Sequence, residues 1–150
     1  MTIQNLVKRI QDIMRQDAGV DGDAQRISQL VWLLFLKVYD AKEEEWEFMD
    51  DNYESIIPEE LKWRSWAPDN KDGKALTGGA LLDFVNNQLF PTLKDLEVDE
   101  YTPQRAAIVK TVFEDAYNYM RDGILLRQII NILNEVDFNE GYLFEFFDDI

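Results

Sequence analysis

The sequence of 150 residues contains no histidine and no cysteine. Without these residues the chain has no imidazole base, no thiolate nucleophile, no disulfide bond and none of the nitrogen or sulfur ligands of zinc sites. It also has no Asn-x-Ser/Thr acceptor for N-glycosylation. These absences fit a reducing, intracellular compartment.

Long hydrophobic runs are missing as well. The longest uninterrupted apolar run, residues 30–36, is seven residues long, whereas a membrane-spanning helix needs about 20. The N-terminus lacks the continuous apolar core of a signal peptide. We therefore expect a cytoplasmic protein with no membrane partner.

Positive charge is scarce, since 15 Lys and Arg face 30 Asp and Glu, for a net charge of −15. The chain as a whole therefore disfavours nonspecific binding to nucleic acid. The charge is unevenly distributed, because residues 40–60 hold ten acidic residues and one lysine, whereas residues 1–39 carry a net charge of +1. With 46% hydrophobic residues, the chain has enough apolar material for a folded core.

Apolar residues recur at helical spacing along the chain, and alternation typical of strands is nowhere sustained. A first helix over residues 3–14 has one apolar stripe. The turn at residues 17–23 then leads to a helix over about residues 24–46, with Asp23 as its N-cap. This helix is apolar on every side over residues 30–36, so it must be surrounded by protein. We expect an all-α fold, a compact multi-helix bundle around this central helix.

Three shorter helices are expected to follow an exposed loop at residues 67–77. Thr77 is predicted to cap the first, which Pro91 is expected to end or bend. The second begins at Thr102-Pro103, and Asp122 caps the third. In the second, Ile108, Val109, Val112 and Phe113 are expected to point inward. The third runs through the apolar residues Ile124, Leu125, Ile129, Ile130, Ile132 and Leu133. Residues 1–150 are expected to form one domain. Residues 142–150 look helical but contain no stop signal, which predicts a fragment of a longer chain.

Motifs that would carry chemistry are incomplete. The glycines form neither a dinucleotide-binding turn nor a Walker loop. The turn that starts at Asp17 has half the ligands of a calcium loop, lacking the carboxylate at position three and the glutamate at position twelve. We therefore predict no catalytic, cofactor-binding or metal-binding residue.

Five residues are candidates for contacts with a partner or DNA. The basic residues of the first helix, Lys8, Arg9 and Arg15, are suited to phosphate or an acidic partner, although a solvated face explains them more simply. Trp63 and Trp66 are suited to base stacking. Packing in the core or between subunits is the stronger interpretation, because stacking platforms usually lie in basic grooves.

Four phrases of the sequence are specific to one family. They are DAQRISQLVWLLFLKVYDAKEEEW (residues 23–46), YESIIPEELKWRSW (53–66), LTGGALLDFVNNQLFPTL (76–93) and FEDAYNYMRDGILLRQIINILNEVDF (113–138). The chain thereby resembles the N-terminal helical domain of the modification (M) subunit of type I restriction–modification systems. The likeness spans nearly the whole chain and weakens after Phe138.

The resemblance implies a parent enzyme that uses S-adenosylmethionine to methylate the N6 amino group of adenine in DNA. It also implies three partners: a second M subunit, a specificity subunit and a restriction subunit. The glycine motif and the Asn-Pro-Pro-aromatic motif of such enzymes belong to the following domain, and neither occurs here. The resemblance thus implies a non-catalytic domain that serves subunit assembly and closure around DNA. The alternative is an acidic protein that mimics DNA to inhibit a nuclease or restriction enzyme.

Overall fold

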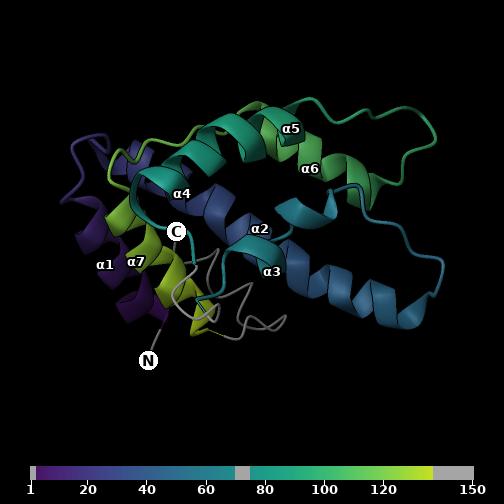
Figure 1. Ribbon diagram of the computed structural model, residues 1–150, viewed down its shortest axis with the longest axis horizontal. Coiled ribbons are helices and arrows are strands. Elements are labelled where there is room, and N and C mark those ends of the chain that lie inside the picture. Colours follow the sequence, from purple (N-terminus) through teal and green to yellow (C-terminus); the bar gives the residue numbers. More distant parts are fainter. Residues whose placement is uncertain (1–2, 70–74, 137–150) are drawn as a thin grey trace.

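A long helix, α2 (Asp23–Met49), runs through the molecule, and shorter helices cover it (Figure 1). This computed structural model describes residues 3–69 and 75–136, and within these ranges it is helical without strands. The all-α prediction is confirmed. The other elements are α1 (Ile3–Met14), the 3-10 turn η1 (Glu59–Leu61), α3 (Trp63–Trp66), α4 (Gly78–Phe84), the π-helical turn η2 (Val85–Leu89), α5 (Phe90–Lys94), α6 (Gln104–Glu114) and α7 (Gly123–Asn134).

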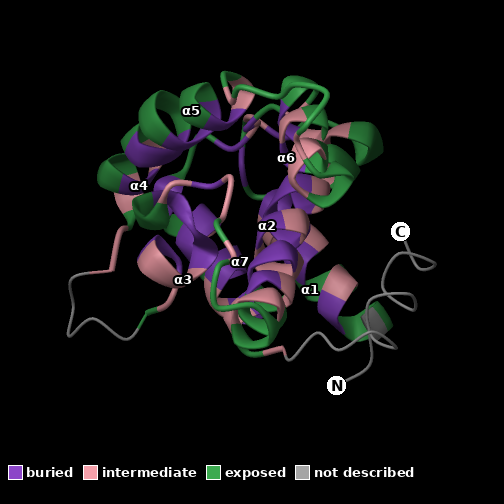
Figure 2. Ribbon diagram, turned by 90° about the vertical axis from the view of Figure 1, so that its right-hand side faces the viewer, coloured by how far each residue is buried: buried purple, intermediate pink, exposed green. Residues whose placement is uncertain are grey.

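The apolar stretch of α2 lies at the centre of the core, as predicted. Trp32, Leu33 and Leu34 are fully buried, and Figure 2 shows buried positions on the sides of α2 and α7 that face the interior. The Trp32 ring meets Phe90 edge-on at a centroid distance of 4.8 Å and Phe113 at 6.5 Å. Aromatic side chains from α5 and α6 thus close over the middle of α2.

The ends of the helices follow local sequence rules. Asp122 caps α7, because its carboxylate accepts hydrogen bonds from the backbone N–H groups of Ile124 and Leu125. Asp23 is the first residue of α2 and not its N-cap, a position taken by Gly22 with φ 125°. Thr77 occupies the N-cap of α4 as predicted, but its side chain makes no capping hydrogen bond.

Pro91 is predicted to end or bend the helix in which it lies, and it does not end it. The elements α4, η2 and α5 follow one another without a break from Gly78 to Lys94. Within η2 the backbone widens, and the N–H of Phe90 donates to the carbonyl of Val85. Pro91 follows this widened turn directly, as the second residue of α5.

Ile108, predicted to point inward, is exposed, and so is Ile124 in the first turn of α7. Ile108 is 45% exposed and Ile124 is 60% exposed. Consecutive helical residues are about 100° apart around the axis, so when Val109 and Gly123 face the interior their neighbours turn toward solvent. The predicted helix over residues 142–150 lies outside the described residues.

The predicted exposed loop is anchored to α7 at both of its described ends. Ala67 is fully buried, and its carbonyl accepts hydrogen bonds from Arg127 and, at 3.1 Å, from Asn134 Nδ2. Arg127 Nε also donates to the carbonyl of Leu76 at 2.7 Å. Burial lowers the pKa of Arg127. The carbonyl groups of this loop therefore hold a buried cation.

No helix in residues 3–69 and 75–136 is long and apolar enough to cross a membrane.

The first residues of α4 and α7 meet at two glycines. A Cβ added to Gly123 would lie 1.9 Å from the carbonyl oxygen of Gly78, so only glycine fits there. Gly78 has φ +57°, a conformation that side chains rarely adopt. This contact fixes the start of α7 beside the start of α4.

We expect Gly123→Ala to destabilise the fold, because the new methyl group collides with backbone that cannot rotate away. The expected loss is about 1–3 kcal/mol or more in the free energy of unfolding, measured by urea denaturation. Gly79→Ala is the matched control, since nothing lies within 4 Å of its added Cβ. The control is expected to be neutral or to gain up to about 1 kcal/mol. Equal behaviour of the two variants would contradict the packing argument.

Candidate functional site: a groove beside the α6–α7 connection

A buried carboxylate holds the connection between α6 and α7, residues 115–122, in place. Asp17, in the turn after α1, is 3% exposed. It accepts hydrogen bonds from the backbone N–H groups of Gly19 at 2.8 Å, of Arg121 at 3.0 Å and of Asp122 at 2.9 Å. The residue that begins the incomplete calcium loop thus acts as an acceptor for backbone donors. Sequence analysis missed this role, because two of the donors are more than 100 residues away.

A network of amide side chains fixes the connection from the other side. Gln29 Nε2 donates to Asn118 Oδ1 at 2.9 Å, and the N–H of Tyr119 donates to Gln29 Oε1 at 2.8 Å. Asn118 Nδ2 donates in turn to Asn86 Oδ1 at 3.0 Å. Gln29 and Asn118 are both buried, so the bond between them is made away from water. They join α2, the connection and η2 into one unit.

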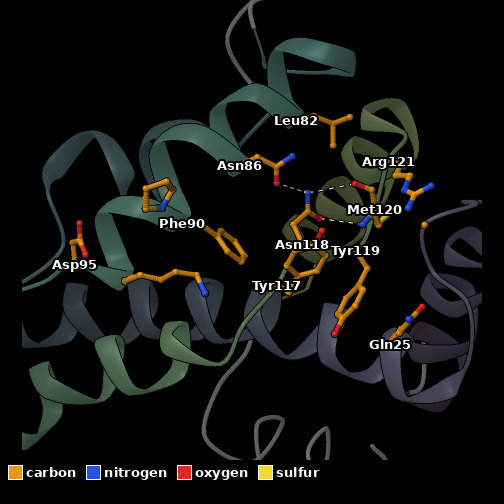
Figure 3. A pocket seen from close by; sticks show the side chains of 13 residues that line it. Gln25, Leu82, Asn86, Phe90, Asp95, Tyr117, Asn118, Tyr119, Met120 and Arg121 are labelled. Atoms are coloured by element: carbon orange, nitrogen blue, oxygen red, sulfur yellow. Dashed lines mark hydrogen bonds between the residues drawn. The ribbon is translucent and has the colours of Figure 1, made fainter.

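A groove of about 900 Å³ opens between this connection and the η2–α5 segment (Figure 3). Its lining includes the apolar side chains of Leu82, Phe90 and Met120, and the exposed Pro91. Tyr117 and Tyr119 stand along one side with their rings edge to face, at a centroid distance of 4.9 Å. Tyr117 is 61% exposed. The groove therefore combines an apolar surface with accessible aromatic rings.

The charged side chains of the groove have a positive balance. Lys94 and Arg121 line it together with one acidic residue, Asp95. The ammonium group of Lys94 donates to the carbonyl of Ala116 at 2.9 Å and lies 5.9 Å from the centroid of the Phe90 ring. Within residues 3–69 and 75–136, no carboxylate forms an ion pair with Arg121. The net charge of this lining, +1, contrasts with the −15 of the chain.

The C-terminal half of α2 is strongly acidic, and part of its charge is neutralised by the η1–α3 segment. Arg64 binds the buried carboxylate of Asp40 at 2.8 Å and Glu47 at 2.9 Å. Lys62 lies 3.2 Å from Glu47 and 2.8 Å from Glu59. The hydrogen bond from Arg64 is the main reason that the pKa of Glu47 is lowered.

A buried acid and two tyrosines continue this acidic region toward α6. The Tyr53 hydroxyl donates to Glu43 Oε2 at 2.5 Å. Burial and this carboxylate raise the pKa of Tyr53, and burial followed by the charge of Glu43 raises the pKa of Tyr39 to about 12. The Arg105 guanidinium lies 4.9 Å from the Trp46 ring and 5.3 Å from the Tyr53 ring. These contacts brace the C-terminal half of α2 against the start of α6.

The five residues singled out from the sequence do not form one site. Lys8 and Arg9 are exposed on α1, and the exposed Arg15, directly after its last residue, pairs with Asp12 at 2.8 Å. Their contact with a partner stays a prediction.

Trp63 and Trp66 are instead buried in the core, as the stronger interpretation has it. Their indole N–H groups donate to Asn134 Oδ1 at 2.8 Å and to the carbonyl of Leu61 at 3.0 Å. Among the described residues, no group of three or more acidic side chains is arranged to hold a metal ion.

Comparisons with known proteins agree on one family. Residues 3–133 match the family described as the HsdM N-terminal domain. The chain is 55% identical over 150 residues to the type I restriction enzyme EcoEI methylase subunit of Escherichia coli, and it spans 30% of the length of that protein.

Two solved structures have the same fold. A modification subunit from Vibrio vulnificus YJ016 aligns with a TM-score of 0.82 and 28% identity, over 98% of this chain and 33% of that one. A structure that describes complex assembly and conformational transition of the type I R-M system aligns with a TM-score of 0.76 and 34% identity, over 93% of this chain and 27% of that one.

We expect Asp17→Ala to lower the free energy of unfolding by about 3 kcal/mol, because it leaves buried backbone N–H groups without their acceptor. Chemical denaturation measures this loss. Asp12→Ala removes an acid of α1 that makes only an exposed ion pair, and it is expected to cost about 0.5 kcal/mol or less. Similar losses in the two variants would show that Asp17 does not hold the connection.

Proposed function

Since the chain belongs to the family of HsdM N-terminal domains of type I restriction–modification methylase subunits, we propose that it serves subunit assembly and closure around DNA rather than catalysis. The observation that carries this proposal is that the whole chain matches a methylase subunit but spans only 30% of its length, which leaves the larger part of such a subunit for catalysis. In the parent subunit, we propose, this domain precedes a catalytic domain that methylates adenine at N6. Cytoplasmic localisation belongs to the same proposal.

The residues of this chain do not fit S-adenosylmethionine, the cofactor proposed for the parent. Its one pair of adjacent glycines, Gly78-Gly79, begins α4 within a described structure that has no strand, whereas the nucleotide-binding turn of a Rossmann fold joins a strand to a helix. We therefore assign cofactor binding to the remainder of the parent and derive no catalytic step here.

The distribution of charge supports a definite orientation relative to DNA. The proposed partners are a second M subunit, the specificity subunit, the restriction subunit and, through their complex, DNA. Residues 40–60 hold ten acidic residues against one lysine, and they include the far end of α2. Phosphate groups repel such a surface. We therefore propose that the side of the domain that turns toward DNA carries the exposed cations Lys8 and Arg9 of α1 and Arg15 directly after it.

Deletion of residues 3–133 from the full-length subunit tests the proposed role. We expect the deleted subunit to bind S-adenosylmethionine but to co-elute poorly with the specificity subunit, and methylation of a DNA site to fall at least tenfold. Size-exclusion chromatography and a methyl-transfer assay measure these effects. Unchanged assembly and methylation would refute the proposal.

Competition of the isolated chain with DNA for a restriction complex would favour the DNA-mimic alternative.

Calorimetry tests the assignment of the cofactor site. We expect no heat of binding when S-adenosylmethionine is titrated into the isolated chain, and a measurable heat with the full-length subunit under the same conditions. Tight binding by the isolated chain would place a cofactor site within residues 1–150 and overturn the assignment.

A further inference from the structure

We propose that the groove beside the α6–α7 connection binds a segment of a partner protein that carries an apolar anchor side chain and a carboxylate. The inference rests on the proposed function in assembly, and it names the surface through which the domain would take part. The surface is defined by Phe90, Pro91, Tyr117, Tyr119 and Arg121.

The apolar part of the groove has the composition of a protein–protein contact. Tyrosine, phenylalanine, methionine and arginine are the residue types enriched in such interfaces and at their energetic centres. Here Phe90 and Met120 lie beneath the opening, and the exposed ring of Tyr117 stands beside it. A partner side chain placed between Tyr117 and Pro91 would cover apolar surface that this chain leaves open to water.

The charge of the groove indicates the second feature of the partner. Arg121 presents a guanidinium group that no carboxylate of the described residues engages, and a guanidinium binds a carboxylate with two parallel hydrogen bonds. A second cation, Lys94, is engaged by the carbonyl of Ala116. One free cation suits a single carboxylate on a peptide segment. A nucleic-acid strand would require several cations to neutralise successive phosphates.

The α6–α7 connection, which forms one wall of the groove, is held by hydrogen bonds before any partner binds. Asp17 accepts hydrogen bonds from the backbone N–H groups of Arg121 and Asp122, and Asn118 is fixed by Gln29 and Asn86. A partner would therefore not have to order this connection, and more of the contact energy would appear as affinity. Tyr101, in contrast, is an exposed tyrosine in a turn before α6 and does not belong to the groove.

Photo-crosslinking in the assembled complex tests the identity of the occupant. A benzophenone amino acid replaces Tyr117 in the full-length methylase subunit, which is assembled with the specificity subunit and a duplex carrying the target site. We expect crosslinks to a segment of another polypeptide that contains an acidic residue, mapped by mass spectrometry. The same group at Tyr101, which is 85% exposed and outside the groove, is the control. Crosslinks from position 117 to DNA or to its own subunit, or none above the control, would overturn the inference.

Binding measurements on variants test the chemistry. Tyr117→Ala and Arg121→Glu are each expected to raise the dissociation constant for the partner subunit at least tenfold, as loss of a central tyrosine or arginine typically does. Tyr101→Ala is the matched control and is expected to stay within about threefold of the native affinity, because Tyr101 lies outside the groove. Thermal unfolding of each variant checks that the fold is intact. Native affinity in both groove variants would overturn the inference.

The two proposals fail in different ways. If deletion of residues 3–133 abolishes assembly while the groove variants bind normally, the domain serves assembly through another surface. If the deletion leaves assembly unchanged, the proposed function itself is wrong.

Discussion

The structure depends on the need to keep water away from a helix that is apolar around its whole circumference. Residues 30–36 of α2 present no side that water would solvate favourably, so the rest of the chain must enclose this stretch. Trp32 lies at its centre, and Phe90 and Phe113 from later helices meet its ring. Each surrounding helix needs only one apolar stripe, and its other faces remain available for partners.

Apolar contacts enclose α2 but do not determine how the surrounding segments are placed relative to one another. Buried polar groups determine that arrangement. Asp17, Gln29 and Arg127 are all buried, and each binds backbone groups of a segment distant in sequence. A buried polar group is stable only when its hydrogen bonds are made, so each of them selects one arrangement of its neighbours. The groove has a defined shape because two of these groups, Asp17 and Gln29, hold one of its walls.

Sequence reasoning succeeded where the cause of a structure is local. The all-round apolar stretch predicts the central helix, and Asp122 two residues before Ile124 predicts a capped helix start. It failed where the cause lies in contacts between distant segments. The role of Asp17 depends on residues 121 and 122, and the requirement for Gly123 depends on the carbonyl of Gly78. The groove was not predicted at all, because its lining comes from three separate stretches of the chain.

The contacts that hold the two ends of the domain differ in their response to ionic strength. At the acidic end of α2, Arg64 and Lys62 hold carboxylates through charge, and dissolved salt weakens the attraction between partly exposed charges. Arg127, in contrast, holds the ends of the 67–76 loop through carbonyl groups, and its buried position shields it from dissolved ions. A rise in salt concentration would therefore loosen the brace along the second half of α2, while the contact of α7 with this loop stayed intact.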